Sequence, residues 1–293
     1  MNQVVDDNNF SWKKILTFLG LTFFLTALFD VPSVILKPSG TAAQLFNTAA
    51  MWSPALAVFI TKLLFRESLK NMGWKWAGNK LNLLAFLLPI TYSLIGYLLI
   101  WKVGWGKFYN LDFVKETVTS FGISSLPSEW IICIYVVFIG TFGLVRSASN
   151  ALGEEIGWRG FLVPELYKKF GFIKTSLITG IIWASWHYIV LIFGDYNNGT
   201  TIWYGLTCFS IMIIASCFIY TWLTIKSKSL FPAVILHATH NLYIQRIFTP
   251  LTESNANTPW FANEFGAVIP LVTIVFAIFF IIKRKELTIT VSN

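Results

Sequence analysis

Apolar runs long enough to cross a bilayer recur along this chain of 293 residues, and they restrict its fold more than any other feature. A membrane-spanning helix needs about 20 mostly apolar residues. Hydrophobic residues make up 55% of the chain and charged residues 12%, about half the charged share of a soluble domain. Backbone groups in lipid must bond within their own segment, which favours helices. The sequence therefore predicts an all-α, polytopic transmembrane helical bundle.

Eight spans are predicted, and lysine and arginine residues give their orientation. The spans cover about residues 15–35, 42–65, 81–103, 129–162, 176–193, 203–225, 230–248 and 265–282, with the fourth helix ending near Pro164. Most basic residues fall at 13–14, 66–80, 168–174, 226–228 and 283–285, which an even number of spans places on one side. Basic loops stay inside. We expect cytoplasmic N- and C-termini, a single membrane domain over residues 1–293, and a multi-pass protein of the plasma membrane.

The net charge of +8 does not indicate nucleic acid as a partner. The basic residues form short clusters between apolar runs, a pattern typical of topology signals rather than of a nucleic-acid groove. The three cysteines, Cys133, Cys208 and Cys217, all fall in apolar stretches. An odd number without ligand spacing argues against a disulfide framework or a zinc knuckle.

Charges concentrate within the apolar background at residues 154–160, where Glu154, Glu155 and Arg159 lie within seven residues. Ionisable side chains at membrane depth are costly and usually functional. On a helix, Glu155 and Arg159 are four residues apart, in the favourable order for an ion pair. Glu154 points about 100° away from Glu155. We predict that Arg159 holds Glu155 and leaves Glu154 available for chemistry.

All three histidines also fall in predicted spans. His187 is expected in the middle of the fifth span, whereas His237 and His240 are expected on the seventh. His237 and Asn241 are four residues apart and share one helix face. A lone membrane histidine usually packs and hydrogen-bonds, but three of them with a Glu-Glu pair favour a single polar site. His240 is interpreted as a packing or supporting residue.

Such a site suits amide hydrolysis. A carboxylate and an imidazole can hold a water and take its proton. A second imidazole and an amide can donate hydrogen bonds to a developing oxyanion. The sequence contains no HExxH, no GxGD and no GxSxG, so it lacks the motifs of the other intramembrane proteases.

The three motifs resemble the CPBP family, which includes type II CAAX prenyl proteases and bacteriocin-processing or self-immunity proteins. Glu154-Glu155-x-x-x-Arg159-Gly, an aromatic residue four positions before His187, and His237-x-x-x-Asn241 occur in the family's order. The second motif commonly has Phe where this chain has Trp183. The resemblance covers residues 130–246, which we expect to form a CPBP-like catalytic core.

The resemblance implies a role for each matched residue. Glu154 and His187 would activate water, and His237 and Asn241 would form the oxyanion hole. Glu155 and Arg159 would support them. Members of the family have also been called metalloproteases, so a zinc ion held by Glu154, His187 and His237 stays open beside the cofactor-free arrangement.

The predicted function is that of an intramembrane endopeptidase whose site opens toward the cytoplasmic half. Its substrates would be peptides or protein tails at the bilayer, including prenylated CAAX-type or bacteriocin-type chains. One alternative is a non-proteolytic self-immunity or peptide-binding protein. A proton-coupled transporter is less favoured, because no internal repeat is visible.

Overall fold

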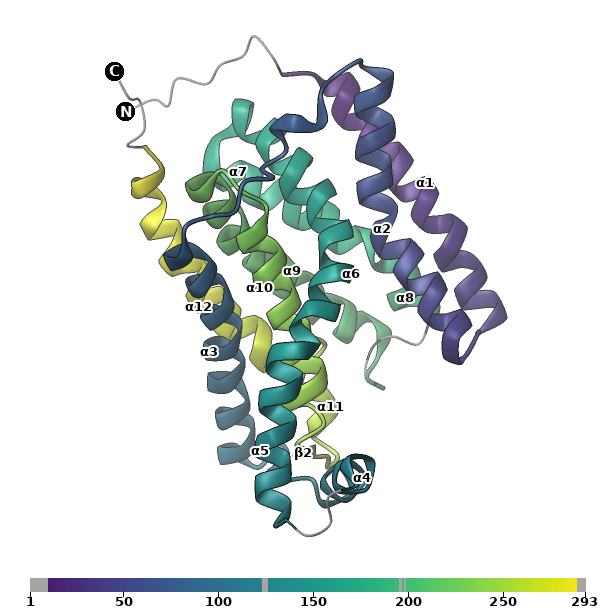
Figure 1. Cartoon of the computed structure of the whole chain (residues 1–293), viewed down its shortest axis with the longest axis vertical. Coiled ribbons are helices and arrows are strands. Elements are labelled where there is room, and N and C mark those ends of the chain that lie inside the picture. The colour runs from purple at the N-terminus through teal and green to yellow at the C-terminus, as the bar shows by residue number, and fades with distance from the viewer. Residues whose placement is uncertain (1–9, 123–125, 195–196, 198, 289–293) are drawn as a thin grey trace.

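The computed structural model describes residues 10–122, 126–194, 197 and 199–288, and most of them are helical. The described strands are the two-residue β1 (Lys107–Phe108) and β2 (Thr252–Glu253), which pair antiparallel with Lys107 opposite Glu253. Figure 1 shows the helices as one elongated bundle. The predicted all-α helical bundle is confirmed.

Five described segments are long and apolar enough to cross a membrane. They are Trp12–Leu36, Gly40–Leu64, Asn79–Val103, Ser128–Trp186 and Ile202–Ser227. The predicted seventh and eighth spans are also helical, but they are shorter or interrupted. The protein is therefore an integral membrane protein, while the number of eight spans stays a prediction. Residues 1–9 and 289–293, where the predicted cytoplasmic termini fall, lie outside the described residues.

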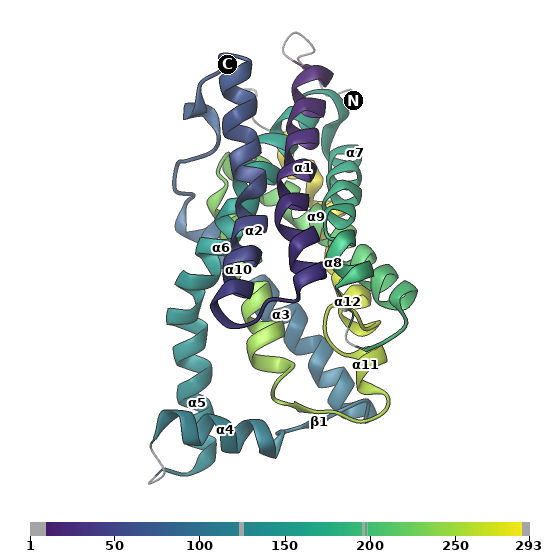
Figure 2. The same cartoon turned by 90° about the vertical axis from the view of Figure 1, so that its right-hand side faces the viewer.

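The first half of the chain forms a helical hairpin, a third span and a short surface helix. α1 (Trp12–Leu36) and α2 (Gly40–Leu64) run antiparallel, and the short helix η2 (Leu69–Asn71) leads to α3 (Asn79–Val103). α4 (Leu111–Phe121) follows β1 and lies at the bottom of Figure 2 beside α5. In α4, Val114 and Thr117 are buried and the charged residues are exposed. This short helix is therefore amphipathic.

The segment that carries the Glu-Glu motif is longer and less regular than predicted. α5 (Ser128–Phe138), the π-helical η3 (Ile139–Gly143), α6 (Leu144–Gly157), the π-helical η4 (Trp158–Leu162) and α7 (Val163–Trp186) follow without an intervening loop. The prediction that the helix ends near Pro164 is wrong, because this proline occupies the first turn of α7, where its missing N–H costs nothing. The chain instead turns at Gly171, whose φ of 64° suits glycine.

The second half packs around that segment. It comprises α8 (Tyr188–Phe193), α9 (Ile202–Ser227), α10 (Phe231–Asn241), the π-helical η5 (Leu242–Phe248), α11 (Thr258–Phe261), α12 (Val268–Lys283) and the short helix η6 (Arg284–Thr288). Three π segments therefore interrupt the helices. Among the described residues, η4 contains Arg159 of the Glu-Glu motif and η5 begins directly after Asn241, and such segments are frequent at functional sites.

The lysine-rich connections gather at one end of the bundle. The Lys14 Nζ atom lies 2.7 Å from Glu67 Oε1 and 3.5 Å from Glu165 Oε2, and Lys62 Nζ lies 3.0 Å from Glu67 Oε2. These ion pairs join the start of α1, the end of α2 and the start of α7. In Figure 1 this end is at the top, and α4 and the start of α5 lie at the bottom.

Two glycines bring α6 against α2 and so position the Glu-Glu pair. A Cβ on Gly153 would lie 2.8 Å from the Met51 carbonyl oxygen and 2.9 Å from Trp52 Cα. A Cβ on Gly157, one turn later, would lie 2.5 Å from Pro54 Cβ. Small residues four apart allow close backbone contact between membrane helices. Residues 154–156 therefore pack beside the first half of α2.

Candidate active site

The predicted ion pair of Glu155 and Arg159 is present, and both side chains are fully buried. Arg159 Nη1 donates to Glu155 Oε1 over 3.0 Å, and Nη2 donates to Cys217 Sγ over 3.4 Å. The guanidinium carbon lies 4.1 Å from the ring centroid of Trp183 and 3.9 Å from that of Tyr220. Arg159 is thus held between two aromatic rings, which its planar group suits.

Glu154 points away from this pair and lines a cavity of about 500 Å³. The indole Nε1–H of Trp183 donates to Glu154 Oε2 over 2.8 Å. The other carboxylate oxygen, Oε1, lies 4.0 Å from His237 Nε2. Trp183 therefore fixes the orientation of the carboxylate and leaves one oxygen facing the cavity. The sequence motif contained this tryptophan but did not reveal its hydrogen bond.

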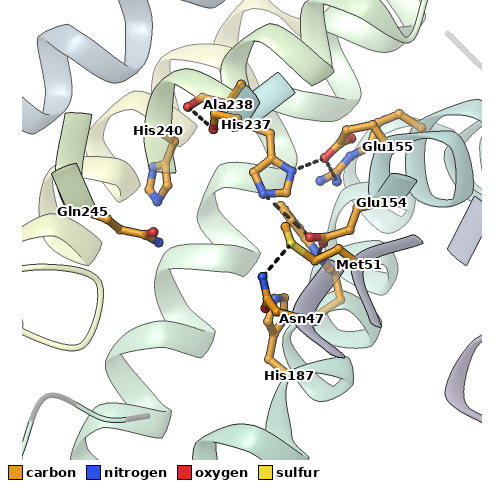
Figure 3. Close-up of polar contacts among 12 residues, drawn as sticks. Asn47, Met51, Glu154, Glu155, His187, His237, Ala238, His240 and Gln245 are labelled. Atoms are coloured by element: carbon orange, nitrogen blue, oxygen red, sulfur yellow. Dashed lines mark hydrogen bonds and ion pairs between the residues drawn. The ribbon is translucent and has the colours of Figure 1, made fainter. Parts of the chain in front are cut away.

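His237 connects the two glutamates, as Figure 3 shows. Its Nδ1 lies 2.8 Å from Glu155 Oε1, and its Nε2 faces Glu154. An ionised carboxylate can only accept, so Nδ1 carries the proton of this bond. Sequence reasoning placed His237 and Glu154 in one site but did not anticipate the bond to Glu155, which joins residues 82 positions apart.

His187 also lines the cavity but lies at the end of its helix, not in the middle of a span. It follows Trp186 at the end of α7 and precedes α8, so the predicted placement is wrong. The regular helix α7 ends at Trp186, about one turn after Trp183, and His187 is the residue that caps it. His187 Nδ1 lies 2.9 Å from the Trp183 carbonyl oxygen. A carbonyl can only accept, so Nδ1 donates, and the neutral ring keeps a lone pair on Nε2.

Asn241 is the last residue of α10 and lines the same cavity, one turn after His237. The structure therefore brings all four predicted catalytic residues to one cavity: Glu154, His187, His237 and Asn241. They come from α6, the end of α7 and α10. Glu155 and Arg159 lie in the wall behind Glu154.

The cavity opens at the end of the bundle opposite to the lysine-rich connections. Its deep part is formed by buried Glu154, Trp183 and His237, whereas lining residues near the α1–α2 connection and after α8, such as Lys37 and Gly194, are exposed. The expected opening toward the cytoplasmic half stays a prediction, and the positive-inside orientation would put these exposed residues on the other side. The helix periodicity gave no information about which end of the packed helices stays open.

A second polar group in the cavity wall was not predicted. His240 Nδ1 lies 2.6 Å from the Tyr92 hydroxyl, and His240 Nε2 lies 3.1 Å from Glu264 Oε1. Gln245 donates to the same carboxylate over 3.0 Å. His240 thus has the supporting contacts that the sequence reading allowed for. Asp30 of α1 also lines the cavity. Neither Glu264 nor Asp30 belongs to a sequence motif. The available signal was an acidic residue within or beside an apolar stretch.

The arrangement does not fit the zinc alternative. A catalytic zinc needs three protein ligands and an open position. Within the described ranges, no three His, Cys, Asp or Glu side chains are close enough together to hold one metal ion. Glu154, His187 and His237 therefore line one cavity without forming a ligand set.

Comparison with known proteins agrees with this geometry. The profile of the family described as type II CAAX prenyl endopeptidase Rce1-like matches residues 137–243, which contain all three motifs. A CAAX prenyl protease 2 of Methanococcus maripaludis is 35% identical over 94 residues. The resemblance to the CPBP family is confirmed. The match covers 30% of this chain and 34% of the relative, so the chain spans about a third of the length of the curated relative it matches.

Proposed function

We propose that the protein is an intramembrane endopeptidase that hydrolyses peptide bonds of membrane-associated substrates. The observation that carries this proposal is the convergence of Glu154, His187, His237 and Asn241 on one cavity inside an apolar bundle. The cavity offers a carboxylate, imidazole nitrogens and an amide within one enclosed space. Those groups are the ones that water attack on an amide requires.

In the proposed reaction, Glu154 and His187 hold the attacking water. Trp183 occupies Glu154 Oε2, which leaves Oε1 to accept the proton as the water oxygen bonds to the carbonyl carbon. The lone pair on His187 Nε2 accepts a hydrogen bond from the water's other O–H, which stays on the oxygen, and so orients the water. The proton on Glu154 then passes to the leaving nitrogen as the C–N bond breaks. Glu154 thus acts first as general base and then as general acid.

Asn241 and His237 stabilise the oxyanion in different ways. The Asn241 amide donates an N–H at any pH. His237 already gives its Nδ1–H to Glu155, so it can donate through Nε2 only when both ring nitrogens carry protons. The Glu155–Arg159 pair acts through His237, because it fixes the ring's orientation and which nitrogen faces the substrate.

The substrates are peptides or protein tails that reach the cavity from the membrane, with prenylated CAAX-type and bacteriocin-type chains as the leading classes. Residues 130–246 supply the catalytic core within a single membrane domain over residues 1–293, located in the plasma membrane. CAAX-type cleavage is suggested by the matched relative, whose name describes a CAAX prenyl protease.

The proposal is tested by comparing membrane peptides from cells that produce the wild-type protein and cells that produce Glu154→Gln. Mass spectrometry should detect cleavage products that depend on the wild-type protein and disappear in the variant. Equal peptide sets, with the biological effect retained by Glu154→Gln, would indicate the self-immunity or peptide-binding function instead.

A further inference from the structure

Asp30 is a buried carboxylate in the cavity wall that the proposed mechanism does not use. It lies on α1, is 9% exposed and lines the same cavity as Glu154. Within residues 10–122, 126–194, 197 and 199–288, the structure gives its carboxylate no hydrogen bond and no ion pair, and the like-charged Glu154 lines the same cavity.

An unpaired buried carboxylate is costly. Removing such a group from water without a partner costs several kcal/mol, and a neighbouring negative charge adds to the cost. After Lys13 and Lys14 in its first turn, α1 has no charged residue other than Asp30, and its exposed side chains include Leu16, Phe24 and Leu28. An ionisable residue within a membrane span usually has a function. Because no described side chain pairs with Asp30, its partner is expected to be a group of a bound ligand.

The other two acids of the cavity already have partners. Glu154 accepts from Trp183, and Glu264 accepts from His240 and Gln245. Asp30 therefore remains as a negative charge with open hydrogen-bonding positions. The complementary group is a cation that carries N–H donors, because charge-assisted hydrogen bonds to a carboxylate are strong.

The packing of α1 puts this carboxylate close to the reacting groups. Thr26, one turn before Asp30 on the same helix face, accepts a hydrogen bond from Trp186 Nε1 over 2.7 Å. The Trp186 ring packs edge-on against His187, with centroids 4.6 Å apart. A group bound at Asp30 would thus share the cavity with Glu154 and His187, the residues that hold the water.

We propose that Asp30 binds a positively charged group of the substrate, a lysine or arginine side chain or a free α-amino group, close to the bond that is cleaved. This inference rests on the proposed peptidase function and names its substrate class. Asp30 is a specificity residue: it holds the substrate cation and takes no part in proton transfer. Peptides with a basic group near the scissile bond are then favoured over neutral ones.

The test uses the purified full-length protein and a set of quenched fluorescent peptides. The set carries lysine, norleucine or glutamate at each position around the scissile bond, each with a free or an acetylated N-terminus. The wild type should cleave the best lysine peptide with a kcat/KM about 10- to 100-fold above its norleucine counterpart, the range for a charged hydrogen bond. Preference for the free N-terminus alone would identify the α-amino group as the source.

Asp30→Asn should reduce that ratio to about one and leave norleucine cleavage within a few-fold of the wild type. Asp30→Glu should keep part of the preference. Asp112→Asn, the same change on exposed α4, should not alter it. A wild-type ratio near one, or an unchanged ratio in Asp30→Asn, would overturn the proposal.

Peptide binding to Glu154→Gln separates this inference from the proposed function. Affinity should be about 10- to 100-fold higher for the lysine peptide than for the norleucine peptide, and Asp30→Asn in the same background should remove the difference. If the difference is present without any cleavage by the wild type, Asp30 recognises a cation and the peptidase function fails. If binding does not distinguish the peptides, the role of Asp30 fails whatever the cleavage result.

Discussion

Substitution of Arg159 by alanine should destabilise the folded protein far more than it changes the shape of the cavity. The guanidinium is fully buried, bonds to Glu155 and lies between the rings of Trp183 and Tyr220. Alanine removes the positive charge and both ring contacts. Among the described residues, Glu155 then keeps only His237 as a hydrogen-bond donor.

The magnitude follows from these contacts. Removal of one partner from a buried ion pair costs about 3–5 kcal/mol. Each desolvated cation–π contact contributes up to about 2 kcal/mol. The contributions overlap and His237 still compensates Glu155, so we expect a loss of about 3 kcal/mol. That loss lowers the ratio of folded to unfolded protein roughly 100-fold, since 1.4 kcal/mol is tenfold.

The assay is reversible unfolding in mixed micelles, followed by tryptophan fluorescence, with Glu154→Gln as the matched control. Glutamine can still accept the hydrogen bond from Trp183, so the control should unfold within about 1 kcal/mol of the wild type, in the range usual for mild substitutions. Arg159→Lys should fall between them, because it keeps the charge but loses the planar fork.

Adding Glu155→Gln to Arg159→Ala should recover part of the lost stability, because it removes the unpaired charge. Equal unfolding of Arg159→Ala and Glu154→Gln would refute the division of roles between the two glutamates. A double variant whose loss equals the sum of the single losses would show that Glu155 and Arg159 are not coupled.

Three further predictions address the oxyanion hole, the helix contact and the side of the opening. Asn241→Ala should reduce kcat about 100- to 1,000-fold with little change in KM, and wild-type turnover in this variant would remove the oxyanion role. Gly153→Ala should lower the yield of folded protein, because its Cβ would lie within 3.0 Å of α2 backbone atoms, whereas Gly20→Ala, with no atom within 4 Å, should not; equal yields would contradict the close contact. Cysteine at Ser33, in the cavity, should react with an impermeant reagent outside intact cells and cysteine at Gly78 should not; the reverse pattern would put the opening in the cytoplasm.

The sequence was informative about helices and about pairs within one helix. Apolar runs predicted most of the helices but not the continuous helical segment over residues 128–186, and spacing predicted the pair of Glu155 and Arg159. That His187 and Asn241 share a site with Glu154 was predicted from the order of the three motifs. This prediction depended on the resemblance to a family. The motifs lie in separate helices, and helix periodicity does not determine which faces meet.

Contacts between distant segments were beyond prediction from the sequence. The bond between His237 and Glu155, which joins residues 82 positions apart in the chain, depends on how α10 approaches α6. In the sequence, Asp30 looks like a residue at the end of the first span. Its place in the cavity wall follows from the packing of α1 against Trp186. The helical segment continues past Pro164 because this proline lies in the first turn of α7. The composition of the segment did not reveal that position.

The most direct test of the central claim is hydrolysis of a quenched peptide library by purified protein in lipid nanodiscs, with wild type and Glu154→Gln measured at equal amounts of folded protein. The account predicts cleavage by the wild type and loss of at least about 100-fold in Glu154→Gln, the lower range for a general base. Release of the same products at the same rate by both proteins would contradict it.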